Sequence, residues 1–304
     1  MTAQSIPPLA RLHKRPASPL PANAADCHMH VFGPFDRYPL AARRGYDVPD
    51  APLAVHEAMK RDVGLARTVI VQPSGYDTDN RCTLAALAEL GPRGRAIVVV
   101  EPEIAERDLE VLHRAGVRGV RLNLVSVKGR YGDDPAGLIA AFAKRLKPRG
   151  WHLQLFCGNA LVAELETVLA EAPLDVVVDH MGLPDARAGL DQPGFQALLR
   201  LLRKGHVWAK LAGADRVTEH TGKLADALPY MKALVEANVE RLVWGSDWPN
   251  IGFHTGAGGG TPPFVPYRPL DAGEMLDLLA TAAPDPGSRE KILSRNPARL
   301  YQFG

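Results

Sequence analysis

The sequence lacks the features that mark secreted, membrane-spanning and nucleic-acid-binding proteins. It has three cysteines, Cys27, Cys82 and Cys157, and no Cys-x-x-Cys pair, which argues against both a disulfide framework and a thiolate zinc site. No apolar stretch approaches the roughly 18 to 20 residues needed to span a bilayer. The 36 Lys and Arg nearly balance the 34 Asp and Glu, which makes nucleic acid a poor candidate for a partner. We therefore expect a cytoplasmic protein with no nucleic-acid or membrane partner, and we leave open whether it forms a homo-oligomer.

The first 24 residues also lack the compact apolar segment of a signal peptide, and they are rich in proline. We expect residues 1–24 to form an extended arm, either a frayed tail or a segment that lies on a partner subunit. With 304 residues and a hydrophobic fraction of 46%, the chain can bury a large core. We expect one folded domain over residues 25–304.

Eight short apolar runs alternate with amphipathic segments along that domain. The first run begins near residue 25, and the others lie at 68–71, 96–100, 119–122, 152–156, 176–179, 207–211 and 242–244. Unbroken apolar strands separated by helices of about 10 to 15 residues are typical of parallel strands buried on both faces. The pattern predicts an α/β fold, a single (β/α)8 TIM barrel, in which the active site lies at the carboxyl ends of the strands.

Four polar side chains fall at those carboxyl ends. His28 and His30 form a His-x-His in the first apolar run, and residues two apart in a strand point to the same face. His180 ends the sixth run, and Asp247 follows the eighth. Because the four positions agree on one face of the barrel, we interpret them as catalytic rather than as isolated structural residues.

Two kinds of chemistry fit this set. Three neutral imidazoles and a carboxylate form a plausible shell for one divalent metal such as zinc, which lowers the pKa of a bound water to roughly 7. Without a metal, Asp247 can act as general base for water while two or three histidines donate hydrogen bonds to the carbonyl oxygen of a reactive ester. We take the mechanism without a cofactor as the first choice. If a metal is bound, its predicted ligands are His28, His30, His180 and Asp247.

Three arginines near the same end of the barrel favour an acidic substrate. Arg121 lies inside the fourth apolar run, Arg130 lies in the loop after it, and Arg216 follows the seventh run. An arginine in an apolar strand is costly to bury unless it meets an anion, and its planar fork suits a carboxylate. An internal salt bridge is the competing interpretation for Arg121, and a solvated charge is the competing one for Arg130.

Two long loops follow strands on the predicted catalytic face, at residues 31–50 and 248–270. Long loops at this position often form the walls of a pocket. Tyr46 lies in the first loop, and Ser74 and Tyr76 directly follow the second strand. We expect these three side chains to line the mouth of the barrel and to orient oxygens of the substrate.

Several short segments together resemble the amidohydrolase superfamily, in the branch that contains 2-pyrone-4,6-dicarboxylate lactonase, 4-sulfomuconolactone hydrolase and sugar-acid lactonases. The resemblance runs from about Ala25 to Tyr301 and is carried by residues 26–34, 71–74, 77–80, 179–182, 244–249 and 296–301. It implies a (β/α)8 barrel that hydrolyses a cyclic ester, with Asp247 activating water and His28, His30 and His180 around the carbonyl. It also implies that Arg121 and Arg216 bind substrate carboxylates and that Tyr46 and Ser74 belong to the pocket.

The chain departs from typical metal-dependent members of that superfamily. Where those members carry a lysine or glutamate after strand four and a histidine after strand five, this sequence has Asn123 and either Gln154 or Phe156. We include Gln154 among the expected substrate-binding residues. Relative to the pyrone lactonase, Phe156 and Leu183 replace a tyrosine and an arginine, which weakens recognition of a planar dicarboxylate by a few kcal/mol.

The sequence therefore predicts a hydrolase that opens a carboxylate-bearing lactone, either the pyrone dicarboxylate itself or a related acidic lactone. A metal-dependent decarboxylase of an aromatic or unsaturated acid, a sugar-acid lactone hydrolase or isomerase, and a barrel that only binds its ligand are the alternatives. Zinc content with release of CO2 would distinguish the decarboxylase. A protein that only binds would turn over no lactone.

Overall fold

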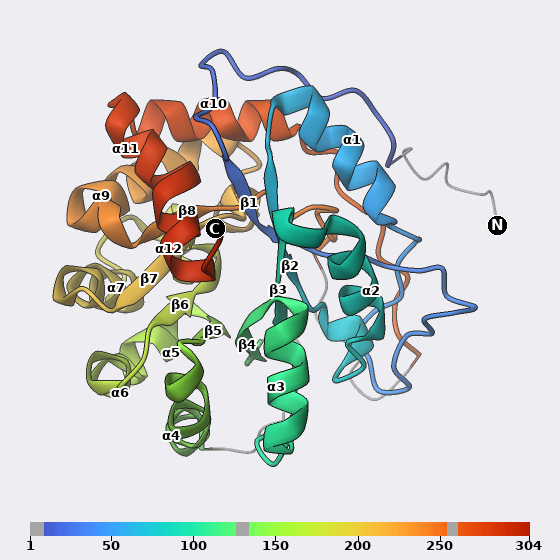
Figure 1. Ribbon diagram of the computed structural model, residues 1–304. Coiled ribbons are helices and arrows are strands. Elements are labelled where there is room, and N and C mark those ends of the chain that lie inside the picture. Colours follow the sequence, from blue (N-terminus) through green and yellow to red (C-terminus); the bar gives the residue numbers. More distant parts are fainter. Residues whose placement is uncertain (1–8, 126–133, 254–260) are drawn as a thin grey trace.

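The computed structural model describes residues 9–125, 134–253 and 261–304, and its centre is an eight-stranded parallel sheet (Figure 1). Each strand pairs with the next along the chain. The strands are β1 (Ala25–Met29), β2 (Arg67–Val71), β3 (Gly94–Val98), β4 (Val117–Asn123), β5 (His152–Phe156), β6 (Val176–Val178), β7 (Val207–Leu211) and β8 (Leu242–Trp244). The predicted (β/α)8 barrel is confirmed, and all eight apolar runs form strands.

Helices follow the strands and cover the outside of the barrel (Figure 1). The longer ones are α1 (Leu53–Val63), α2 (Arg81–Leu90), α3 (Glu106–Ala115), α4 (Pro135–Leu146), α7 (Pro193–Lys204), α9 (Leu228–Asn238) and α10 (Ala272–Ala282). The shorter ones are α5 (Asn159–Glu164), α6 (Glu166–Glu171), α8 (Ala214–Val217), α11 (Pro286–Glu290) and α12 (Asn296–Tyr301). In the described ranges, none of the helices has the length and apolar character needed to cross a membrane.

The barrel interior is apolar at the end opposite the predicted site. Tyr301 and Phe303, at the carboxyl end of the chain, pack against strand side chains that include Val69, Ile97 and Trp208. Arg95 donates hydrogen bonds to the carbonyls of Tyr301 and Gln302 and so holds this terminus in place. The C-terminal segment therefore covers the end of the barrel opposite the predicted site, and in Figure 1 the C-terminus lies over the middle of the ring of strands.

The first and last strands meet through backbone hydrogen bonds at the opposite end. The Asp247 N–H donates to the His28 carbonyl at 2.8 Å, and the His30 N–H donates to the Trp248 carbonyl at 2.8 Å. The two strands that close the barrel thus bring the His-x-His and the aspartate together. Their juxtaposition is a property of the backbone and does not depend on the side chains' own contacts.

The buried carboxylate of Asp26 reinforces this junction. It accepts hydrogen bonds from the His28 N–H, from the N–H and hydroxyl of Ser246, and from His56 Nε2 on α1. Burial alone would raise the pKa of Asp26, but its hydrogen bonds with His56 and Ser246 hold that pKa below its ordinary value. One side chain therefore joins β1, the segment after β8 and the covering helix α1.

The two long loops meet on the catalytic face. Asp47 and Phe264 form a parallel bridge, in which the Asp47 N–H donates to the Pro263 carbonyl and the Val265 N–H donates to the Asp47 carbonyl. The first loop thus lies against the second, as expected for segments that form a common wall.

The proline-rich arm packs on its own barrel. The Ala17 N–H donates to Asp277 on α10, Lys14 forms an ion pair with Asp277, and the His13 N–H donates to Asp62 on α1. The described part of the arm, residues 9–24, therefore contacts α1 and α10 of its own chain, and its contact with a partner subunit stays a prediction. Hydrogen bonds from the backbone of the arm to side chains on α1 and α10 hold the arm in place. The proline content of the arm does not predict these contacts.

We predict that Asp26→Asn lowers the free energy of unfolding by about 3 kcal/mol or more, because several buried donors lose a charged acceptor. Urea unfolding followed by circular dichroism measures the change. Asp36→Asn is the matched control, because Asp36 is exposed, and it should change the same free energy by less than about 0.5 kcal/mol. Equal effects of the two substitutions would contradict the role given to Asp26.

Candidate active site

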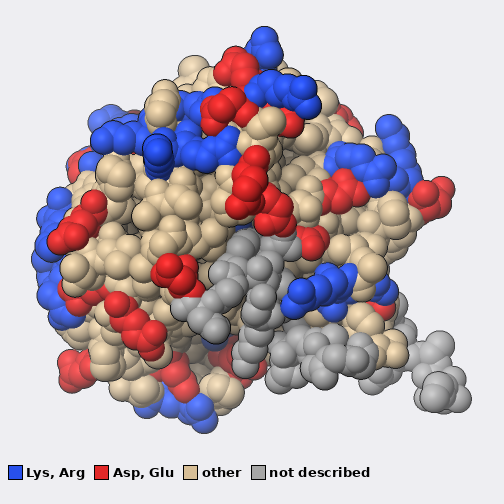
Figure 2. Space-filling model, turned by 90° about the horizontal axis from the view of Figure 1, so that it is seen from below, with Lys and Arg blue, Asp and Glu red and all other residues tan. Residues whose placement is uncertain are grey.

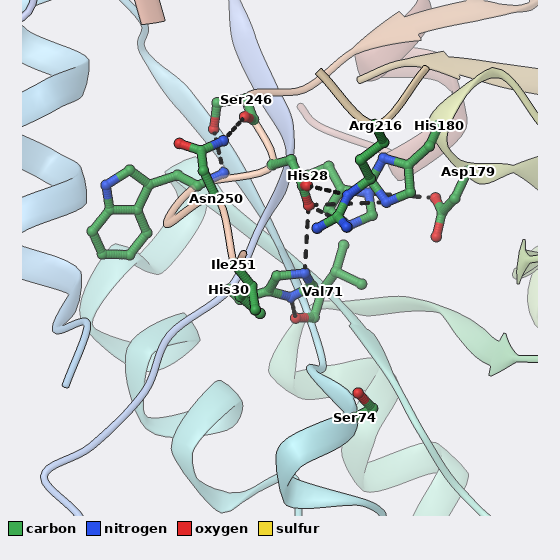
Figure 3. Close-up of polar contacts among 12 residues, drawn as sticks. His28, His30, Val71, Ser74, Asp179, His180, Arg216, Ser246, Asn250 and Ile251 are labelled. Atoms are coloured by element: carbon green, nitrogen blue, oxygen red, sulfur yellow. Dashed lines mark hydrogen bonds and ion pairs between the residues drawn. The ribbon is translucent and has the colours of Figure 1, made fainter. Parts of the chain in front are cut away.

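One carboxylate oxygen lies among three imidazole nitrogens. Asp247 Oδ1 is 3.7 Å from His28 Nε2, 3.8 Å from His30 Nε2 and 3.9 Å from His180 Nε2. Figure 3 shows that His28 and His30 from the end of β1, His180 after β6 and Arg216 on α8 (Ala214–Val217) point toward one another. All four residues that the sequence predicts as catalytic are therefore brought together.

The backbone around this cluster is strained and closely packed. His180 and Asp247 have φ angles of 51° and 55°, in the left-handed region that non-glycine residues rarely adopt. A Cβ atom on Gly245 would lie 2.6 Å from His28 Cβ, and one on Gly213 would lie 2.6 Å from His180 Nδ1. His28 and His180 therefore fit against the segments after β8 and β7 only because Gly245 and Gly213 have no side chain.

His30 has a defined tautomer. Its Nδ1 lies 2.7 Å from the Val71 carbonyl, which can only accept, so Nδ1 carries the proton. Burial lowers the pKa of His30 to about 3, with further lowering by His28 and Arg121, so the ring is neutral at pH 7. Its Nε2 therefore presents a lone pair toward Asp247. Of the two or three histidines expected to donate to a carbonyl oxygen, His30 is therefore not one, since its Nε2 can only accept there.

His28 faces two groups of opposite charge below the cluster. Its Nδ1 is 3.4 Å from Asp179 Oδ1 and 3.4 Å from Lys210 Nζ. If Nδ1–H donates to Asp179, Nε2 has a lone pair; if Lys210 donates to Nδ1, Nε2 carries the proton. The first state suits a metal ligand, and the second suits a hydrogen-bond donor to a substrate oxygen.

Arg216 forms an ion pair with Asp247. Its Nε donates to Asp247 Oδ2 at 2.7 Å, which leaves Oδ1 as the oxygen that faces the imidazoles. Burial would raise the pKa of Asp247, but Arg216 and the three histidines hold that pKa well below its ordinary value. The carboxylate is therefore ionised at neutral pH.

A cavity of about 440 Å³ opens above the cluster. The predicted residues that line it are His30, Tyr46, Ser74, Arg121, His180, Arg216 and Asp247. The Ser74 hydroxyl donates to the Tyr46 hydroxyl at 3.2 Å, so these two side chains form a polar section of the wall. Arg130 lies outside the described residues.

Two predicted substrate-binding residues lie behind the cavity and do not line it. Tyr76 accepts a hydrogen bond from the Gly33 N–H at 2.7 Å and stacks on Phe32, so it supports the first long loop from inside. Gln154 is fully buried, and it donates to Asp179 and accepts from Lys210. The structure does not place these two side chains in contact with a substrate. Their polar atoms form hydrogen bonds with neighbouring protein groups, so they support the site from behind.

Arg121 lines the cavity and also has an internal partner. Its Nε is 3.3 Å from Asp179 Oδ2, and its guanidinium lies over the Phe156 ring at 5.1 Å. The internal salt bridge, one of the two interpretations of the sequence, is therefore present. The guanidinium remains part of the cavity wall, so the pair does not remove it from reach of a ligand.

Lys210 and Asp179 form a buried charged layer that sequence reasoning did not assign. Lys210 Nζ donates to Gln154 Oε1 at 2.7 Å and lies 3.5 Å from Asp179 Oδ1. Burial lowers the pKa of Lys210, whereas Lys210 and His28 outweigh burial at Asp179 and hold its pKa well below its ordinary value. A lysine inside an apolar strand is the same signal that identified Arg121 and would have found Lys210.

The donor set can hold a divalent cation. His28, His180 and Asp247 each offer a ligand atom within 4.8 Å of the others. His28 Nε2 and Asp247 Oδ1 are buried and make no hydrogen bond within the described part of the chain, so both are unsatisfied polar atoms that a ligand would complete. Two imidazoles and a carboxylate are common zinc ligands, and the lone pair of His30 lies on the same side.

A model of the amidohydrolase family matches residues 25–303. The chain belongs to the amidohydrolase family. This amidohydrolase is 34% identical to 2-pyrone-4,6-dicarboxylate hydrolase of Comamonas testosteroni, over 94% of this chain and 92% of the relative. It is also 34% identical to 4-sulfomuconolactone hydrolase of Rhizobium radiobacter, over 93% of this chain and 91% of the relative.

A crystal structure from Pseudomonas putida, whose proposed activity is 2-pyrone-4,6-dicarboxylic acid hydrolysis, matches this amidohydrolase with a TM-score of 0.75. The two are 32% identical, and the match covers 93% of this chain and 99% of the other. The resemblance noted in the sequence is thereby confirmed at the level of the family.

We predict that Asp179→Asn destabilises the fold more than Lys210→Met. Removing Asp179 leaves two buried cations without a counterion, at a cost of about 3 to 5 kcal/mol. Removing Lys210 leaves Arg121 and Asp179 balanced and costs about 1 to 3 kcal/mol for the unsatisfied Gln154 amide. Urea unfolding of both variants measures the difference, and the reverse order would show that Asp179 does not anchor this layer.

Proposed function

We propose that this amidohydrolase hydrolyses a lactone that bears a carboxylate. The observation that carries the proposal is the position of Asp247 Oδ1, an ionised oxygen among three imidazoles at the floor of a cavity that Arg121 and Arg216 line. The arginines supply charge complementary to a carboxylate. The names of two curated relatives, hydrolases of a pyrone dicarboxylate and of a sulfomuconolactone, support the same substrate class.

The proposed reaction begins with a water molecule held by Asp247 and His30. Asp247 Oδ1 accepts one proton of the water, and the Nε2 lone pair of His30 accepts a hydrogen bond from the other. The water oxygen forms a bond to the lactone carbonyl carbon. The ring carbon–oxygen bond then breaks, and the proton held by Asp247 passes to the ring oxygen that leaves. Water and lactone thereby give the hydroxy acid, or its keto tautomer for an enol lactone.

His28 and His180 face the carbonyl oxygen in this proposal. Each can donate from Nε2 as that oxygen gains charge, and for His28 this requires Lys210 to donate to Nδ1. Because the pKa of Asp247 is held low, the carboxylate is a weak base. A ring ester, which is more reactive than an amide, fits such a base.

A metal-dependent decarboxylase on the same scaffold is the second candidate, and the grouping of His28, His180 and Asp247 favours it. A divalent cation held by these residues would act as a Lewis acid toward a substrate oxygen. Arg121 and Arg216 would orient the acid in either case. We take hydrolysis without a required metal as the first proposal, because Arg216 already occupies one oxygen of Asp247.

We predict that protein depleted to less than about one metal ion per ten subunits keeps its lactonase activity. Metal content is measured by elemental analysis, and hydrolysis is followed with a pH indicator over a panel of acidic lactones. Restoration of activity only by added zinc would assign the cation a catalytic role. Release of CO2 from an aromatic acid by the zinc-loaded protein would establish the second candidate.

Asp247→Asn should lower kcat for lactone hydrolysis by about 100-fold to 10,000-fold, because the amide cannot accept the proton of water. The variant should remain folded, since Asn also tolerates a positive φ. Asp108→Asn is the control for a lost carboxylate, because Asp108 is exposed on α3 and does not line the cavity, and it should keep most of the activity. Unchanged kcat in Asp247→Asn would remove the general base from the mechanism.

A further inference from the structure

The cavity changes its chemical character between floor and opening. The floor carries Arg121, Arg216 and the catalytic cluster, as described above. The described apolar residues that line the rest of the cavity include Val125, Leu183, Pro184, Val217, Ile251 and Phe253, of which Val125 and Phe253 are exposed. A ligand that fills the cavity therefore meets cations at one end and hydrocarbon at the other.

Two of these apolar side chains are exposed. Val125 is 37% exposed and Phe253 is 41% exposed, and both are among the five large hydrophobic residues exposed in the described ranges. Exposed apolar groups that gather at a cavity mark a binding surface more often than scattered ones do. Their grouping here is an observation independent of the cluster on the floor.

The apolar end of the cavity is held by specific contacts. The Arg268 guanidinium lies over the Phe253 ring at 4.3 Å, and its Nε donates to the Ile251 carbonyl at 3.2 Å. Arg268 also forms an ion pair with Asp215 on α8, the helix that carries Arg216. These contacts fix the apolar wall relative to the arginine on the floor.

The charges on the floor leave room for one anion. Three cations, Arg121, Arg216 and Lys210, lie against two carboxylates, Asp179 and Asp247. This arrangement leaves one positive charge to be neutralised by a ligand.

No lysine or arginine lines the opening of the cavity among the described residues. The ionisable groups there are Glu219 and His220, which are exposed, and Asp185, which is paired with Arg187. A second carboxylate on the substrate would therefore meet hydrocarbon, two carboxylates and an imidazole rather than a guanidinium.

We propose that the site takes a lactone with a single carboxylate and an apolar substituent on the far side of the ring. The carboxylate lies on the floor near Arg121, and the substituent contacts Leu183, Ile251 and Phe253. This inference rests on the proposed lactonase activity and gives that activity a narrower substrate class than the dianions named for the relatives.

The test compares two lactones that differ in one group, 2-pyrone-4,6-dicarboxylate and the same pyrone with propyl in place of the 4-carboxylate. We expect kcat/KM to be at least about tenfold higher for the propyl compound, since two or three buried methylene groups contribute about this factor. An equal or higher value for the dicarboxylate would overturn the proposal.

Two variants at the opening test the location of the substituent. Leu183→Arg adds a cation there and should raise kcat/KM for the dicarboxylate while lowering it for the propyl lactone. Phe253→Ala should lower kcat/KM for the propyl lactone alone. Val111→Arg is the matched control, because Val111 is 58% exposed on α3 and does not line the cavity. If Leu183→Arg and Val111→Arg have the same effect, the apolar subsite is not at the opening.

A binding measurement separates failure of this inference from failure of the proposed function. Calorimetry uses the matching 2-pyridones, in which N–H replaces the ring oxygen, so that the ring carbonyl belongs to an aromatic amide that resists hydrolysis. Tighter binding of the propyl pyridone, without hydrolysis of either lactone, would refute the lactonase and support the amphipathic site. Tighter binding of the dicarboxylate pyridone, or binding of neither, would refute the amphipathic site whatever the hydrolysis data show.

Discussion

The junction between the first and last strands is the constraint on which the site depends. Asp26 joins the backbone of β1 to the segment after β8, and the same segments carry His28, His30 and Asp247. Closing the barrel and assembling the catalytic cluster are therefore the same event. Without the hydrogen bonds at this junction, Asp247 would not be held beside His28 and His30.

The electrostatics of the floor follow from burial and from one ion pair. Burial holds the three imidazoles neutral, and Arg216 keeps Asp247 ionised among them. A neutral ring on each side of a fixed carboxylate leaves that oxygen free of competing hydrogen bonds within the described residues. The charged layer below stabilises this arrangement, whereas the left-handed backbone at His180 and Asp247 costs free energy that the surrounding packing offsets.

The barrel and the catalytic cluster were predictable because both rest on periodic, local signals. The apolar runs, the His-x-His spacing and the polar residue after each strand determine which side chains reach the mouth. The positions of Tyr76 and Gln154 were not predictable, because a side chain near the mouth can turn toward the protein as readily as toward the cavity. Lys210 could have been found as a lysine inside an apolar strand, but its partners Gln154 on β5 and Asp179 after β6 could not be read from the sequence.

The pairing of Arg216 with Asp247 and of Arg121 with Asp179 also needed the three-dimensional structure. The sequence shows cations and acids at the same end of the barrel, but the partner of each is set by strand register and ring packing. The tautomer of His30 is a similar case, because it is decided by the carbonyl of Val71 on the neighbouring strand.

The apolar plug formed by Tyr301 and Phe303 at the far end of the barrel has an evolutionary consequence. The cluster around this plug includes none of the residues that line the cavity, and many of those lie in the loops after the strands. Substitutions in those loops can therefore change which ligand binds while the free energy of unfolding changes little. In this way one barrel can serve related enzymes that act on different small molecules.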